Sequence, residues 1–157
     1  MTISMEKAKG QELTMTRIYD EPREFVFKAW IDPELLAQWW GPEGFVSEVA
    51  VNARPGGQLR MDMRGPDGSI YPNRGVFHEV VEPEKLEFTT GFWDEAGNIQ
   101  MEERTTVTFE EYNGKTKLTV HTVVVRCSPG LSEMLKGLET GWRQSLDRLA
   151  RLARPSA

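Results

Sequence analysis

Residues 128–152, with the sequence SPGLSEMLKGLETGWRQSLDRLARL, carry the longest helical pattern of this 157-residue chain. Ser128 and Pro129 are typical of an N-cap and a first helical residue. Apolar residues then recur at spacings of three and four, which predicts one long amphipathic helix. These residues are Leu131, Met134, Leu135, Leu138, Trp142, Leu146, Leu149 and Leu152. Gly137 and Gly141 each cost about 1 kcal/mol of helix propensity relative to alanine, so we expect them to allow close packing or to shape a pocket.

The sequence before this helix alternates between apolar and polar residues over most of its length, which predicts β-strands. The expected strands are residues 13–19, 45–51, 58–64, 70–81, 86–92, 101–111 and 115–125. Start signals containing Asp20 and Asp32 predict two short helices directly after the first strand. The order favours an α+β fold, in which a curved antiparallel sheet of about six or seven strands wraps around the C-terminal helix.

This arrangement predicts an internal cavity. A twisted sheet curls around the helix that covers it, and a straight helix does not fill the space inside such a curl. Aromatic and methionine side chains are suited to line the space, because methionine adapts to irregular shapes. The same pattern also fits an ordinary hydrophobic core, and that alternative stays open for each residue. The candidate lining residues are Trp40, Phe45, Met61, Met63, Tyr71, Phe77, Phe88, Phe92, Arg104, Val120, Thr122, Met134, Leu138 and Trp142.

Two of these candidates are polar. If Tyr71 or Arg104 faces inward, it can orient a carboxylate, phenol or carbonyl group of a ligand. The mixed charges of residues 102–104 also fit a solvated sheet surface, which is the competing interpretation. For residues 70–81 either set of alternating side chains can face inward, and the pattern slightly favours Gly75 and Phe77.

Composition limits the kinds of partner that the protein can bind and the cell compartment in which we expect it. The formal net charge is −5, which lacks the basic surface needed to bind nucleic acid. No apolar run is long enough to cross a membrane, and residues 1–11 lack the features of a signal peptide. A single cysteine excludes an intramolecular disulfide, so we expect a cytoplasmic protein. We expect residues 1–11 to be flexible and residues 12–154 to form a single domain.

The titratable residues do not form a known catalytic or metal-binding motif. His78 and His121 lie on different predicted strands, and Cys127 has no second cysteine nearby in the sequence. A metal site needs three or four ligands that come together, and a nucleophilic triad needs three converging groups. We therefore predict no metal, no cofactor and no catalytic residue.

Four segments resemble one protein family. They are residues 27–42 (FKAWIDPELLAQWWGP), 54–57 (RPGG), 75–80 (GVFHEV) and 141–149 (GWRQSLDRL). They resemble the AHSA group, homologues of the C-terminal domain of an activator of the large heat-shock chaperone ATPase. This group lies within the START-like, or SRPBCC, superfamily. The resemblance implies a helix-grip fold of the Bet v-like type, with a deep cavity between the sheet and the C-terminal helix.

Three functions follow from the residues and the resemblance together. The first is binding of a small hydrophobic or aromatic molecule, with a possible link to stress. The second is a cyclase-like or hydrolase-like enzyme that uses His78, Glu103 or Arg104 in the same cavity. The third is regulation of a chaperone ATPase, which we rank last because chaperone-activating relatives carry a separate N-terminal domain. A monomer and a homodimer are both compatible with the sequence.

Overall fold

One curved antiparallel sheet and three helices make up the part of the chain that the computed structural model describes, residues 12–41, 43–93, 99–127 and 132–152. The strands are β1 (Glu12–Tyr19), β2 (Val46–Val51), β3 (Gln58–Arg64), β4 (Ile70–Val81), β5 (Lys85–Trp93), β6 (Ile99–Tyr112) and β7 (Lys115–Cys127). The helices are α2 (Arg23–Ile31), α3 (Pro33–Trp39) and α4 (Ser132–Leu152). The predicted flexible segment 1–11 and the predicted helix start at Ser128 and Pro129 lie outside the described residues.

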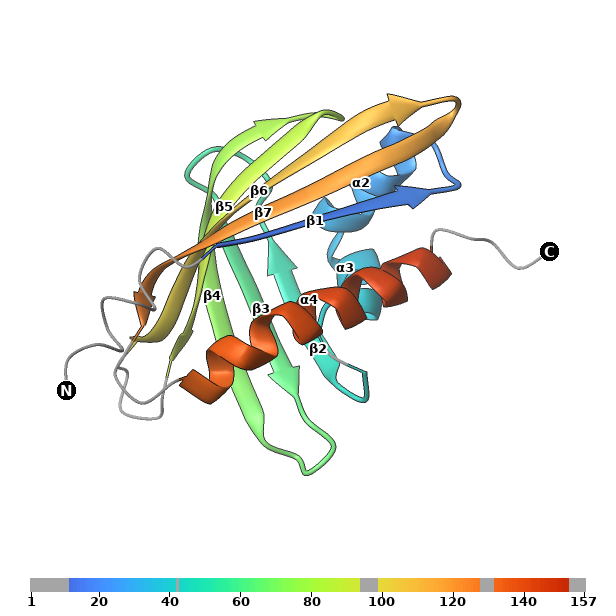
Figure 1. The fold of residues 1–157 in the computed structure, drawn as a ribbon. Coiled ribbons are helices and arrows are strands. Elements are labelled where there is room, and N and C mark those ends of the chain that lie inside the picture. The colour runs from blue at the N-terminus through green and yellow to red at the C-terminus, as the bar shows by residue number, and fades with distance from the viewer. Residues whose placement is uncertain (1–11, 42, 94–98, 128–131, 153–157) are drawn as a thin grey trace.

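The strand order is β1-β7-β6-β5-β4-β3-β2, and all neighbouring strands are antiparallel. Strands β2 to β7 therefore follow one another as hairpins, while β1 joins the sheet beside β7. Figure 1 shows the sheet bending around α4, which crosses its concave side. The predicted seven-stranded helix-grip architecture is confirmed.

The two short helices begin in different ways. The carboxylate of Asp32 accepts hydrogen bonds from the backbone N–H groups of Glu34 (2.9 Å) and Leu35 (3.3 Å), as a helix N-cap does. Helix α2 begins at Arg23 instead, and its N-cap residue, Pro22, makes no capping hydrogen bond through its side chain. Because α2 and α3 are short, their positions depend mainly on the packing of their apolar sides.

Tryptophan side chains from these helices fill the middle of the curl. The ring of Trp30 lies 4.6 Å from that of Trp39 and stacks on that of Trp142 at 6.2 Å. It also contacts two sheet residues, Phe88 at 6.4 Å and Phe109 at 6.2 Å. The space between α4 and the sheet is therefore densely packed around Trp30, and any cavity must lie to one side of it.

Strand β4 changes its alternation partway along. Phe77 is only 1% exposed and faces the core, so the face that the sequence favoured is the inner one. A register shift between Phe77 and Glu79 then places Val80 against the core as well. His78 is exposed, with its Nε2 atom 2.6 Å from the Thr89 hydroxyl. This bulge explains why both alternating sets of residues in β4 looked apolar.

Candidate ligand-binding cavity

A cavity of about 250 Å³ lies between α4 and strands β3 to β6. Its wall combines the segment just after α3, inward-facing strand residues, and one face of α4. The lining residues are Trp40, Gly41, Met63, Asn73, Phe92, Met101, Glu103, Leu138, Gly141, Trp142 and Ser145. The chain thus brings segments about 100 positions apart in the sequence into one wall.

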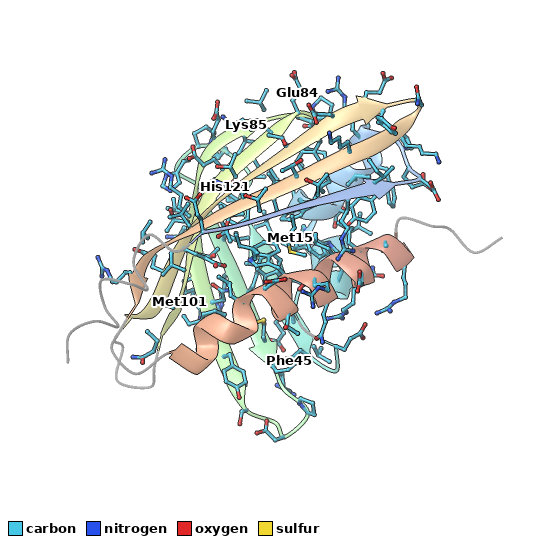
Figure 2. All side chains as sticks on the ribbon, in the orientation of Figure 1. Met15, Phe45, Glu84, Lys85, Met101 and His121 are labelled. Carbon is cyan, nitrogen blue, oxygen red and sulfur yellow. The ribbon has the colours of Figure 1, made fainter. Side chains whose placement is uncertain are left out.

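Most of this wall is apolar and rich in aromatic rings and sulfur. The rings of Trp40 and Trp142 meet edge to face at 5.3 Å. Met101 packs with Phe92 and Leu138, which also contact the main core. Figure 2 shows Met101 on β6, close to the start of the described part of α4. Such a wall suits an apolar ligand of irregular shape.

Helix α4 fixes the position of Trp40. The backbone N–H of Gly41 donates to the Ser145 hydroxyl at 3.1 Å, and the Ser47 hydroxyl donates to the Trp40 carbonyl at 3.0 Å. The guanidinium of Arg148 donates to the carbonyls of Trp40 (3.3 Å) and Gly41 (3.0 Å). Gly41 has a φ of 101°, a conformation that glycine adopts without strain. These bonds hold the indole of Trp40 at the cavity wall.

Gly141 leaves room for the cavity on the helix side. A Cβ atom built at this position meets no other atom within 4 Å. The glycine therefore is not required for close packing against another element. It shapes the pocket, which was one of the two roles expected from the sequence.

Besides Ser145, which accepts a hydrogen bond from Gly41, two buried polar side chains interrupt the apolar wall. Asn73, Phe92 and Met101 lie opposite one another on β4, β5 and β6, and Glu103 lies two residues beyond Met101 on β6. Asn73 is 2% exposed and Glu103 is 6% exposed. The Asn73 Oδ1 and Glu103 Oε2 atoms have no hydrogen-bond partner among the described residues. Because an unpaired buried polar atom is costly, these two acceptors are candidate ligand contacts.

The surroundings of Glu103 favour its neutral form. Burial raises the pKa of its carboxyl to about 7, although a hydrogen bond from Thr122 acts in the opposite direction. Its cross-strand neighbours are Thr90 on β5 and Val124 on β7, and neither carries a charge. The carboxyl group can therefore gain or lose a proton near neutral pH.

Some of the predicted lining residues do lie at the cavity. They are Trp40, Met63, Phe92, Leu138 and Trp142. They come from β3, β5, α4 and the residue just after α3, and so from both the sheet and the C-terminal helix. Met134 was also predicted, but its side chain lies outside the described part of the chain.

Other predicted lining residues belong to the hydrophobic core and do not line the cavity. They are Met61, Phe77, Phe88 and Val120, each no more than 2% exposed. The sequence predicted a gap under α4 but left open, for each residue, whether it lines that gap or belongs to the core. That gap is filled in part by the tryptophans of α2 and α3, and the ring of Trp30 packs against that of Phe88. The cavity consequently lies beside this packed cluster, along residues 138–145 of α4.

Two other aromatic residues predicted to line the cavity, Phe45 and Tyr71, lie near the β3–β4 hairpin. Phe45 and Tyr71 contact each other, with ring centroids 5.8 Å apart, but neither lines the cavity. Figure 2 shows Phe45 near this hairpin, beyond the part of the sheet that α4 covers. Tyr71 is 42% exposed, so it does not present an inward polar group.

The polar predictions for β6 and β7 also need correction. Arg104 lies on the outer face of the sheet, where its Nε donates to the Glu87 carboxylate at 2.8 Å. Thr122 is buried, but its hydroxyl contacts that of Thr105 at 2.9 Å and it does not line the cavity. The polar residue that reaches the cavity is Glu103, the immediate neighbour of Arg104. The sequence-based interpretation of residues 102–104 as a solvated surface is wrong for Glu103.

A simple signal in the sequence locates Glu103 and Asn73. Counting back in steps of two from the inward residues Phe109 and Val107 leads to Thr105, then Glu103, then Met101. The same count from Phe77 leads to Asn73. Asn73 was overlooked, and Glu103 was considered for catalysis but not as a lining residue, because a polar side chain in a strand was taken to face solvent. Ser145 was also missed, although it follows Gly141 by four residues on one helix face.

The other titratable candidates remain separate. His78 is exposed on β4, and His121 on β7 lies 3.8 Å from the carboxylate of Glu12. The side chain of Cys127 lies outside the described residues. Within the described ranges, no three potential metal ligands come together. None of the helices described is long and apolar enough to cross a membrane.

A family model described as "Activator of Hsp90 ATPase homolog 1-like protein" matches residues 20–154. The chain belongs to this family. The resemblance of the tryptophan-rich segment 27–42 to the AHSA group is thereby confirmed. No curated protein shows significant similarity to this AHSA1-like chain.

Several solved structures are similar to this AHSA1-like protein over nearly their whole length. Protein CV1439 from Chromobacterium violaceum is 29% identical, with a TM-score of 0.80, over 92% of this chain and 98% of that one. Protein Ms6760 from Mycobacterium smegmatis is 27% identical, with a TM-score of 0.79, over 93% and 92% of the two chains. The AHSA1 protein from Silicibacter pomeroyi is 27% identical, with a TM-score of 0.76, over 90% and 96%. The helix-grip architecture is thus shared with other AHSA1-like proteins.

Proposed function

We propose that this AHSA1-like protein binds a small, largely apolar molecule in the cavity between α4 and the sheet. The observation that carries the proposal is an aromatic and sulfur-rich wall around a space of about 250 Å³. This volume lies just below the range of about 300–1,000 Å³ that is usual for drug-sized ligands. The expected ligand is therefore smaller than a typical drug molecule.

Apolar burial supplies the driving force for this binding. Each Å² of apolar surface removed from water contributes about 25 cal/mol, so a small ligand must bury most of its surface to bind well. Trp40 and Trp142 offer large flat surfaces, and Met63 and Met101 can adjust their shapes around the ligand. The hydrogen bonds around Gly41 hold Trp40 in place before binding, which lowers the ordering cost.

A thermal-shift panel of small aliphatic, monoaromatic and bicyclic compounds tests the proposal. A compound present at one hundred times its Kd stabilises the folded protein by about 2.7 kcal/mol. For a chain of this size that corresponds to a rise in Tm of roughly 5–10 °C. We expect at least one apolar compound to produce a saturable rise of this kind.

Gly141→Leu and Thr140→Leu form a matched pair for this experiment. Leucine at position 141 grows from a point where a Cβ meets open space, so it fills the cavity without a backbone clash. Thr140 is the exposed neighbour in the same helix. The ligand-induced rise should disappear in Gly141→Leu and persist in Thr140→Leu. A panel without any stabilising compound, or a rise that survives in Gly141→Leu, contradicts the proposal.

Glu103 supports a second candidate function, acid–base catalysis on the bound molecule. A carboxyl group with a pKa of about 7 lies near the value at which a general acid or base works best at neutral pH. His78 and Arg104, the other residues considered for catalysis, face away from the cavity. Metabolite extracts incubated with wild type and with Glu103→Gln can be compared by mass spectrometry. A substrate–product pair should change with wild type alone, and identical extracts would exclude this role.

A further inference from the structure

The chemistry of the cavity wall restricts the kind of polar group that a ligand can carry. Both unpartnered buried atoms in this wall, Asn73 Oδ1 and Glu103 Oε2, are oxygen acceptors. They lie on β4 and β6, with β5 between them. A carboxylate or amide oxygen is satisfied by a ligand N–H or O–H group, so this wall selects hydrogen-bond donors when Glu103 is ionised.

The charge of the wall restricts the ligand further. Among its described residues there is no lysine, arginine or histidine, and Glu103 is the only titratable group. A ligand carboxylate or phosphate would have no cation to pair with there, and it would be repelled by an ionised Glu103. Trp40 and Trp142 add aromatic rings, whose faces attract cations. The formal charge of −5 on the whole chain acts in the same direction.

From this acceptor-rich, cation-free wall, we propose that the ligand is a small apolar amine whose ammonium group is bound by the carboxylate of Glu103. The inference deepens the proposed function and rests on it. The ammonium donates to Glu103 Oε2, and the apolar body packs against Met63, Phe92 and Leu138. Asn73 Oδ1 can accept from a second donor on the same ligand, such as a hydroxyl group.

Proton release accompanies this binding at low pH. An alkyl ammonium keeps its charge up to about pH 10, as lysine does. Glu103 has a pKa of about 7, so below pH 7 its carboxyl must lose a proton before it can pair with the ammonium. The groups that face Glu103 from β5 and β7 are Thr90, Val124 and Thr122, and none of them titrates in this range. The described wall from β3, β4, β5, α4 and the segment just after α3 contributes no second titratable group.

Three probes of similar shape and different charge test the inference by calorimetry. They are 2-phenylethylamine, which is cationic, 2-phenylethanol, which is neutral, and phenylacetate, which is anionic. At pH 8 we expect the amine to bind at least tenfold more tightly than the alcohol, because charge-assisted hydrogen bonds are stronger than neutral ones. The anion should bind most weakly. The affinity for the amine should fall about tenfold from pH 8 to pH 6 and about tenfold again to pH 5.

Two variants separate a role for Glu103 from a general effect on the fold. Glu103→Gln keeps the shape of the side chain and removes its charge, so it should remove both the preference for the amine and the pH dependence. Arg104→Gln changes the next residue, which lies on the opposite face, and should preserve both. The thermal stability of each variant shows whether it is folded.

The outcomes also separate this inference from the proposed function. If the alcohol binds as tightly as the amine, or if the affinity for the amine does not change between pH 8 and pH 5, the amine assignment is overturned and the binding function stands. If the amine preference persists in Glu103→Gln, the assignment is likewise overturned. If none of the three probes binds to wild type, the proposed function fails together with the inference.

Discussion

Glu103 places an ionisable group where its charge is poorly solvated. Its side chain is 6% exposed, and burial raises its pKa from 4.5 in the ordinary case to about 7. The only opposing contribution is a hydrogen bond from Thr122. A neutral or apolar residue would avoid this cost, so the carboxyl group has a ligand-related role in our account.

The unfolding free energy should therefore depend on pH through Glu103. Between about pH 4.5 and pH 7 the folded state holds a proton that the unfolded state has lost, so stability falls as pH rises through this window. The full loss above pH 7 is about 3 kcal/mol. Urea denaturation should show wild type and Glu103→Gln to be similar at pH 4.5, and the variant to be more stable by about this amount at pH 8. A difference that does not change with pH would contradict the burial of an unpaired carboxyl.

Carboxylates on the outer face of the sheet affect the unfolding free energy in a different pH range from Glu103. Burial tends to raise the pKa of Asp62, but hydrogen bonds from Arg74 and Arg60 lower it below its ordinary value. Hydrogen bonding by Arg104, against a smaller effect of burial, also lowers the pKa of Glu87. Groups of this kind contribute stability above their unfolded pKa and lose it as pH falls below about 4. The pH 4.5–8 window therefore isolates Glu103.

At the scale of elements, the contact between α3 and α4 positions the cavity wall. Helix α3 ends at Trp39, and its last carbonyl groups have no partners within the helix. Arg148 of α4 donates to the carbonyls of Gln38, at 3.0 Å, and of Gly41, also at 3.0 Å. One guanidinium group thus caps α3 and holds the segment that carries Trp40.

Replacing Arg148 should loosen this junction. Arg148→Met keeps the apolar stem and removes the donors, so we expect a loss of roughly 1.5–3 kcal/mol of unfolding free energy. Arg148→Lys should recover only part of it, because an ammonium group cannot form the same fork of bonds. Arg151→Met is the matched control, since Arg151 pairs with Glu43 in solvent and should change stability by less than about 1 kcal/mol. Equal effects of Arg148→Met and Arg151→Met in chemical denaturation would contradict the capping role.

Local signals in the sequence account well for the individual elements. Asp32 caps α3 as its position before Pro33 predicted, and Asn113 and Gly114 have φ values of 52° and 81°, as a tight hairpin turn requires. The signal at Asp20 is different, because its carboxylate pairs with Lys115 at 3.2 Å while the N-cap residue of α2 is Pro22. A carboxylate near a helix start can thus be used by a neighbouring strand, which spacing alone does not reveal.

At the scale of the whole molecule, the sequence predicted the fold far better than the site. Period-two patterns, turn residues and one long amphipathic helix define a sheet that grips a helix. The position of the cavity depends on how completely other side chains fill the space between the helix and the sheet. Trp30 packs against both Phe88 and Trp142. Phe77, Phe88 and Met61 were expected to line the cavity, but they are buried in the core. Such packing depends on three-dimensional contacts that periodicity does not encode.

The central claim is that the space between α4 and strands β3 to β6 holds a small apolar ligand. Bromobenzene diffused into crystals of the wild-type protein tests it most directly, because anomalous scattering locates the bromine atom. Our account predicts the main bromine peak inside the cavity, near Met63, Phe92 and Leu138, and its loss in Gly141→Leu. Bromine peaks only on the outer surface, for example beside Phe45 and Tyr71, with none in the cavity, would contradict the account.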